Sequence, residues 1–189
     1  MTPADREFAL KGLEDSRTRL LATMRGLSRE QLEYRPAPDR WSVAENLEHI
    51  IVTEQFVLAR LESPVQQVPD SPQHSRWQGR DEPFIRKLAE EREARFQAPE
   101  RLRPTGRWSI EALVPEFEAA RGLSRDFAAS TQADLRSRFF RHPAPAVGEI
   151  DGYQLLLLIG AHCDRHCTQS EEVMASPGFP RQSERAAER

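Results

Sequence analysis

The sequence of 189 residues contains no run of about 18 apolar residues, which a membrane-spanning helix requires. Residues 1–6 also lack the apolar core that marks a secretory signal peptide. Only two cysteines are present, too few for the disulfide framework of a small secreted domain. We therefore expect a cytoplasmic protein with reduced thiols and without a membrane partner.

An excess of positive charge is also missing. Lysine and arginine number 27 against 30 aspartates and glutamates, which gives a net charge of -3. A nucleic-acid-binding surface normally requires a basic patch or a basic helix, so the charge balance argues against nucleic acid as a partner. The length suits one domain, because a domain of about 150 residues buries roughly 70% of its unfolded surface.

What the sequence does contain is helical periodicity. Apolar residues recur at spacings of three, four and seven in four stretches, which predicts long helices over about 3–27, 42–61, 109–130 and 151–175. Ser42 with Glu45, and Asp151 with Gln154, have the spacing of capping boxes at two helix starts. Pro115 lies too deep for the first turn of the third helix, so that helix is expected to start later or to be kinked.

The connections between these helices are unequal. Residues 28–32 resemble a short capped turn, and residues 131–150 form a second connection. Residues 64–108 are interrupted by six prolines, with one amphipathic helix expected over 84–96, and predict a long crossover. We predict an all-α four-helix bundle over residues 1–178 and a polar, disordered tail over 179–189.

Two histidines stand one turn apart on the fourth helix. His162 and His166 are separated by about 40° around the axis, on the same side as apolar residues such as Leu158 and Ile159. Two inward imidazoles at this spacing can bind one divalent metal if another helix supplies a third ligand. They can equally be core histidines with hydrogen-bond partners, and the spacing alone does not decide between these interpretations.

The third ligand has several candidates. His49 is the only other histidine on a predicted helix, since His74 and His142 lie in proline-rich connections. His49 falls off the main apolar stripe of its helix, together with Val52 and Phe56, and this two-sided apolar helix favours contact with a second subunit. A local site of Cys163, His166 and Cys167 is a weaker alternative, because the cysteines lie about 60–100° away from the histidine face. Gln169 is either a hydrogen-bond partner of the ligands or a polar core residue.

Several motifs together resemble the DinB-like superfamily. They are Ser28-Arg29-Glu30-Gln31-Leu32, Arg35-Pro36-Ala37-Pro38, Trp41-Ser42-Val43-Ala44-Glu45-Asn46-Leu47-Glu48-His49-Ile50, His142-Pro143, Gly148-Glu149-Ile150-Asp151-Gly152-Tyr153 and His162-x-x-Arg165-His166-x-x-Gln169. Ala98-Pro99-Glu100 and Pro104-Thr105-Gly106 are similar to a subset of that family. The resemblance covers about residues 5–175 in the right order; each motif alone would be weak, but their combination is specific.

This resemblance implies an up-down-down-up four-helix bundle with the long crossover between helices two and three. It also implies a divalent metal held by His49, His162 and His166, with zinc or nickel first and iron, cobalt or manganese as alternatives. Three histidine ligands leave open positions, as in catalytic sites. Related members are thiol-dependent S-transferases or isomerases, and others are described as metal-dependent hydrolases. The resemblance thus implies a small-molecule substrate, a low-molecular-weight thiol cosubstrate and a homodimer.

Two hypotheses of function follow. The first is a metal-dependent enzyme, a thiol S-transferase or a hydrolase, for which the sequence names no general base. The second is a non-catalytic, stress-associated helical dimer whose metal is structural. This second hypothesis is motivated by the second helix, which has apolar residues on two sides and could therefore contact a second subunit. Nucleic-acid binding is suggested only by the name of the family.

Overall fold

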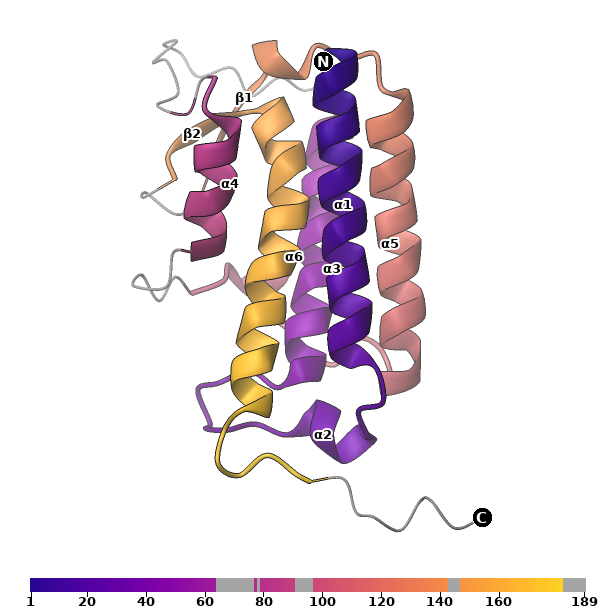
Figure 1. Ribbon diagram of the computed structural model, residues 1–189, viewed down its shortest axis with the longest axis vertical. Coiled ribbons are helices and arrows are strands. Elements are labelled where there is room, and N and C mark those ends of the chain that lie inside the picture. The colour runs from indigo at the N-terminus through magenta and orange to yellow at the C-terminus, as the bar shows by residue number, and fades with distance from the viewer. Residues whose placement is uncertain (64–76, 78, 91–96, 143–146, 182–189) are drawn as a thin grey trace.

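Four long helices build the molecule, shown in Figure 1. The computed structural model describes residues 1–63, 77, 79–90, 97–142 and 147–181. The long helices are α1 (Pro3–Met24), α3 (Val43–Glu62), α5 (Ile110–Ser130) and α6 (Gly152–Met174). α1 and α6 run from the N-terminal end of the bundle to the opposite end, whereas α3 and α5 run back. This direction pattern confirms the predicted up-down-down-up order.

The capping signals read from the sequence mark true helix starts. The Ser42 hydroxyl accepts from the backbone N–H of Glu45 at 3.2 Å, and the Glu45 carboxylate accepts from the N–H of Ser42 at 2.9 Å. Asp151 and Gln154 form the same reciprocal pair at the start of α6. A third box, at Ser28, begins the short helix α2 (Arg29–Glu33), as the predicted capped turn indicated.

Two expectations about the connections need correction. α5 begins at Ile110, directly after Ser109, and continues through Pro115, so of the two expected alternatives, a later start or a kink, the later start is wrong. The connection over residues 131–150 contains a 3-10 turn η2 (Leu135–Ser137) and two strands, β1 (Phe139–Arg141) and β2 (Glu149–Asp151), which pair antiparallel. Strands of three residues are too short to show an alternating pattern, which explains why the sequence did not predict them.

The crossover is partly helical. It contains α4 (Asp81–Glu90), which packs against α6, and the 3-10 turn η1 (Glu100–Leu102). The helix expected over residues 84–96 therefore starts three residues earlier; residues 91–96 lie outside the described part of the chain. Phe179 and Pro180, which we placed in the tail, contact the bundle through an edge-on contact with the Tyr34 ring and a hydrogen bond from the Gln31 side chain. Residues 182–189 are not described.

A buried ion pair joins three helices inside the core. The guanidinium of Arg121 on α5 is fully buried and binds Glu54 of α3 through two parallel hydrogen bonds of 2.8 and 3.0 Å. A further N–H of Arg121 donates to the Ser16 hydroxyl of α1 at 2.8 Å. Burial alone lowers the pKa of Arg121, but Glu54 outweighs burial and leaves the pKa raised. Arg121 therefore stays charged, and removing either partner would leave the other buried without its pair, at a cost of about 3–5 kcal/mol.

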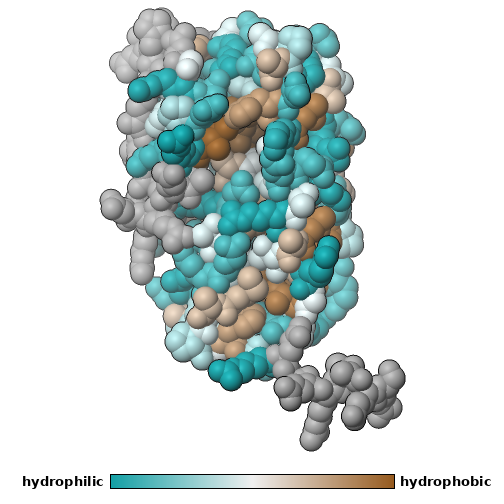
Figure 2. Space-filling model, in the orientation of Figure 1, coloured by the Kyte–Doolittle hydropathy of each residue, from teal (hydrophilic) through white to brown (hydrophobic). Residues whose placement is uncertain are grey.

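The face that carries α1 and α6 is mostly hydrophilic. Figure 2 shows separate hydrophobic patches on this face, surrounded by polar side chains. No helix in the described part of the chain is both long enough and apolar enough to cross a membrane.

Val52 and Phe56, which we expected at a dimer interface, are half-buried within the single chain. The homodimer stays a prediction.

The returning end of the crossover is held by one buried carboxylate. Glu48 of α3 accepts hydrogen bonds from the backbone N–H groups of Thr105 and Gly106 at 2.8 and 2.9 Å, and from the Arg107 guanidinium at 2.8 Å. Burial raises the pKa of Glu48, but these hydrogen bonds outweigh burial and leave the pKa below its ordinary value of 4.5. The segment that leads into α5 is thereby fixed beside the middle of α3.

Replacing Glu48 with Gln tests this attachment. An amide cannot accept all of these hydrogen bonds, so we expect Glu48→Gln to lower the free energy of unfolding by about 1–3 kcal/mol at pH 7. A carboxylate with a lowered pKa stabilises the fold above its unfolded pKa and loses this effect as the pH falls through its folded pKa. The difference between the two proteins in urea unfolding should therefore shrink as the pH falls below about 4.5. A difference that is the same at pH 7 and pH 3.5 would contradict the assignment.

Candidate metal centre

The structure brings together the three histidines that we predicted as metal ligands. His49 lies on α3, and His162 and His166 lie one turn apart on the facing side of α6. Their nearest ring nitrogens all lie within 4.8 Å of one another, and the Nε2 atoms of His49 and His162 are 3.2 Å apart. Among the described residues, this is the one group of three histidine, cysteine or carboxylate side chains with such spacing.

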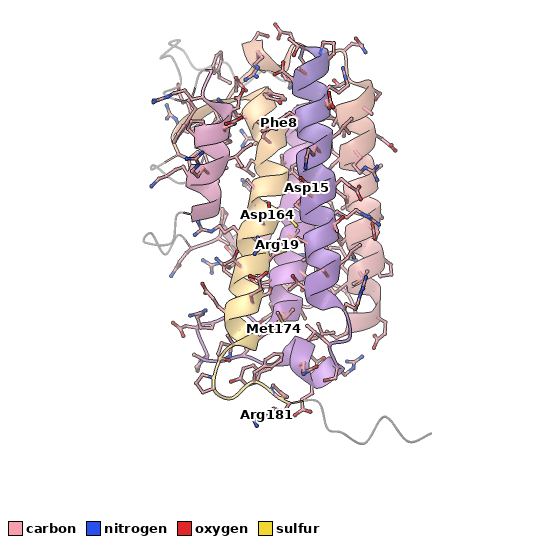
Figure 3. All side chains as sticks on the ribbon, viewed as in Figure 1. Phe8, Asp15, Arg19, Asp164, Met174 and Arg181 are labelled. Atoms are coloured by element: carbon pink, nitrogen blue, oxygen red, sulfur yellow. The ribbon has the colours of Figure 1, made fainter. Side chains whose placement is uncertain are left out.

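The rotation of α6 about its axis directs both of its histidines toward α3. Asp164, between them in the sequence, lies on the opposite side of the helix, where its carbonyl accepts a hydrogen bond of 3.1 Å from Arg19 of α1. Figure 3 shows Arg19 and Asp164 beside each other on the surface of the α1–α6 face. Residues at positions 162 and 166 therefore point away from that surface, toward the interior.

Hydrogen bonds at the outer edge of two rings fix their tautomers. Nδ1 of His49 lies 2.7 Å from the carbonyl oxygen of Leu102 in η1, and because a carbonyl only accepts, Nδ1 carries the proton. Nδ1 of His166 lies 2.9 Å from Oδ1 of Asn46, whose Nδ2 donates to the carbonyl of Ser42 at 3.0 Å. This second bond fixes the Asn46 amide orientation, so His166 also carries its proton on Nδ1. Both Nε2 atoms therefore present lone pairs to the centre of the group.

The distance between two of the ring nitrogens fits a bound ion. Two imidazole nitrogens at about 2.0–2.1 Å from a tetrahedral zinc lie about 3.3–3.4 Å apart, close to the 3.2 Å between His49 and His162. Outer hydrogen bonds from the second ring nitrogen to a carbonyl or an amide oxygen are also typical of metal-binding histidines. The donor set therefore suits a divalent metal.

All three imidazoles are held neutral. Burial lowers the pKa of His49, and the bond to Leu102 only partly offsets it. Burial also lowers the pKa of His162 and His166 well below the ordinary 6.5, and neighbouring histidines lower both further. The Gln169 amide, which can accept from the charged ring, acts in the opposite direction on the pKa of His166, in keeping with the first of the two roles predicted for Gln169. Neutral rings near pH 7 are the form that binds metals.

An aromatic ring covers two of the three histidines, and the third is only half-buried. The Trp41 ring lies 4.8 Å from the His49 ring and stacks on His166 at 6.1 Å, centroid to centroid. His49 and His166 are buried, whereas His162 is half-buried. Arg165, next to His166 in the sequence, donates to the carbonyl of Leu88 on α4 at 3.4 Å. Of the three rings, that of His162 alone keeps a partly exposed surface.

The cysteines do not take part in this group. Cys163 and Cys167 are fully buried in the core between the helices, and the Cys163 thiol donates to the carbonyl of Ser16 on α1 at 3.6 Å. A hydrogen bond to Cys163, together with burial, raises the pKa of Cys167 and keeps it protonated. The alternative site of Cys163, His166 and Cys167 is therefore not formed. His142 is half-buried outside the group, and His74 lies outside the described residues.

Sequence reasoning missed three residues that position this group. Asn46 orients His166, Glu48 holds the crossover, and Trp41 packs on two of the rings. All three lie within eight residues of His49, inside the same motif, but we interpreted Trp41 only as part of a helix start. Asn46 precedes His49 by three positions and so shares one side of the helix, which was a detectable signal. The role of Glu48 depends on residues 105–107, far along the chain, and no local pattern reveals it.

Comparisons with known proteins agree with this description. YuaE of Bacillus subtilis (strain 168) is 24% identical over 156 residues, which cover 79% of this chain and 87% of YuaE. Two solved structures share the fold. One is YfiT from Bacillus subtilis, described as a probable metal-dependent hydrolase with an unusual four-helix bundle topology. It superposes with a TM-score of 0.59 at 12% identity, over 95% of this chain and 91% of YfiT. A conserved protein of Enterococcus faecalis superposes with a TM-score of 0.58 at 14% identity. The superposition covers 92% of this chain and 95% of the Enterococcus faecalis chain.

The sequence profile of the DinB superfamily matches residues 12–170. This match includes α3, α5, most of α1 and α6, the whole crossover and the three histidines. It confirms the family that the sequence motifs resembled, and the chain belongs to the DinB superfamily.

Proposed function

We propose that this protein is a divalent-metal-dependent enzyme whose metal is held by His49, His162 and His166. The observation that carries the proposal is the convergence of these three neutral imidazoles, with the lone pairs of His49 and His166 directed inward and His162 half-exposed. Three histidine ligands with access from one side are typical of catalytic rather than structural sites. The name of YfiT, a protein of the same fold, supports the same class of activity.

A divalent ion in this position supplies a Lewis acid that lowers the pKa of a bound water or thiol and polarises a carbonyl. The chain itself supplies orientation. The Leu102 carbonyl and the Asn46 amide hold two rings in the tautomer that binds a cation, and Trp41 excludes water from one side. Substrate then has to approach past His162.

Two buried carboxylates of α3 are not available as a general base. Glu48 is engaged by backbone N–H groups, and Glu54 is paired with Arg121. The reaction we favour therefore uses a nucleophile whose proton the metal would make acidic, either a low-molecular-weight thiol or water. We propose a thiol S-transferase or a hydrolase, with zinc or nickel as the metal.

Metal content tests the proposal first. Protein purified without chelators and loaded with zinc or nickel should contain about one ion per chain, measured by elemental analysis. His162→Ala should lose most of this metal, because two ligands do not complete the site. His142→Ala, which removes a histidine outside the group, is the matched control and should retain it. Equal metal in His162→Ala and the parent protein would exclude the assigned ligands.

Activity separates the two reaction classes. The zinc- or nickel-loaded protein should conjugate a thiol of the glutathione, bacillithiol or mycothiol type to an electrophile, or else hydrolyse an ester or amide without a thiol. The activity should disappear in His49→Ala and on removal of the metal by a chelator. Metal binding without either activity would favour the non-catalytic helical dimer instead.

Asn46 should act through His166. Because Asn46→Ala removes the acceptor for Nδ1 of His166, we expect zinc affinity to fall about 10–100-fold in competition with a chelator. Asn46→Asp keeps an acceptor at the same place and should lose less. If Asn46→Ala binds zinc as tightly as the parent protein, the proposed orientation of His166 is incorrect.

A further inference from the structure

A histidine outside the metal centre stands on the hairpin of β1 and β2. His142 directly follows β1, and with Pro143 it forms a sequence motif that the three metal ligands do not account for. Its backbone N–H donates to the carbonyl of Gly148 at 2.9 Å, so the pairing of the two strands continues through His142. The hairpin therefore fixes the backbone of His142.

The hairpin directs the His142 side chain toward the bundle. Side chains alternate between the two faces of a strand, so half-buried His142 lies on the face of Phe140 and opposite Arg141. Phe140 is buried in the core, whereas the Arg141 side chain is 81% exposed. Val147, on the returning side of the hairpin, is also buried, and its carbonyl accepts a hydrogen bond of 2.8 Å from the Trp77 indole. The end of the hairpin that carries His142 is thus packed against the bundle.

The same hairpin brings His142 near His162. Phe139 pairs with Asp151, which directly precedes α6, so β1 and α6 start from one corner of the molecule (Figure 1). From that corner His142 lies about 10 Å along the strand, and His162 lies about 15 Å along the helix. Burial is the main cause of the lowered pKa of His162, and nearby positive charges, that of His142 among them, lower it further. The two side chains therefore lie within reach of each other's charge.

His142 is suited to proton transfer beside a metal. An ordinary histidine titrates at about pH 6.5, so its ring can gain and lose a proton during a reaction near neutral pH. A proton on the His142 ring is repelled by a divalent ion held at the three histidines, which favours the neutral ring. A neutral ring can accept a proton, whereas the carboxylates of Glu48 and Glu54 are engaged elsewhere.

We propose that His142 is the proton acceptor of the reaction at the metal centre. A ring nitrogen of His142 takes the proton of the thiol or water nucleophile. The S–H or O–H bond breaks, its electron pair stays on sulfur or oxygen, and an N–H bond forms on the ring. His142 then gives this proton to the leaving group. This inference rests on the proposed function and supplies the general base that the sequence did not name.

The proximity of His142 to the metal can be tested without any activity. Cobalt(II) is paramagnetic and shifts or broadens the NMR signals of nearby groups, whereas zinc does not. In protein with labelled histidines, the ring signals of His142 should differ between the cobalt and zinc forms, and His142→Gln identifies these signals by their loss. Ring signals that are the same in both forms would overturn the proposal.

Kinetics test the proton transfer itself, with glutathione and chlorodinitrobenzene or with nitrophenyl acetate as substrates. His142→Gln should keep about one zinc per chain but lower kcat at pH 7 about 100-fold or more, with little change in KM. Arg141→Gln changes the exposed neighbour on β1 and is the matched control, which should retain the kcat of the parent protein. Thermal unfolding of both variants shows that they are folded.

The outcomes separate this inference from the proposed function. Zinc binding and activity in the parent protein, with an unchanged kcat in His142→Gln, would reject only the role of His142. Loss of zinc from His142→Gln would also overturn that role, because His142 would then be a ligand. A parent protein that binds no zinc would instead reject the metal enzyme itself.

Discussion

The Glu48 carboxylate is the interaction on which the candidate site depends. A buried negative charge is unfavourable unless it is fully hydrogen-bonded, and here backbone N–H groups and Arg107 of the returning crossover supply the bonds. If the crossover separated from α3, the Glu48 carboxylate would therefore lose these hydrogen-bond partners. Because Leu102 and Arg101 precede this attachment by a few residues, the same constraint places one acceptor on His49 and one cation over Phe56.

The polar residues of α3 have separate tasks on different sides of one helix. Asn46 and His49 face the histidines of α6, Glu48 faces the crossover, and Glu54 enters the core to pair with Arg121. The same helix buries apolar residues such as Leu47, Ile51 and Leu61, so hydrophobic burial and the polar contacts both hold it in place. Its stability depends on each group keeping its partner, which also makes the geometry of the site rigid.

Much of this structure could be predicted from the sequence because it depends on local signals. Helix periodicity, the boxes at Ser42 and Asp151, and the i, i+4 spacing of His162 and His166 are all local patterns. His49 could not be assigned from local signals in this way. The helical wheel placed it off the main apolar stripe of its helix, and only the family motif identified it as a metal ligand. It is buried because α6 and the crossover cover that side of α3. The partners Leu102 and Glu48 depend on contacts between segments about 55 residues apart, which no local pattern encodes.

The central claim is that three imidazoles, and no thiolate, hold a divalent metal with a position left open. X-ray absorption spectroscopy of the zinc-loaded protein tests it most directly. The account predicts three imidazole nitrogens at about 2.0–2.1 Å and one further light atom from solvent. Sulfur at about 2.3 Å, which would implicate Cys163 or Cys167, or fewer than three imidazoles in the zinc shell, would contradict it.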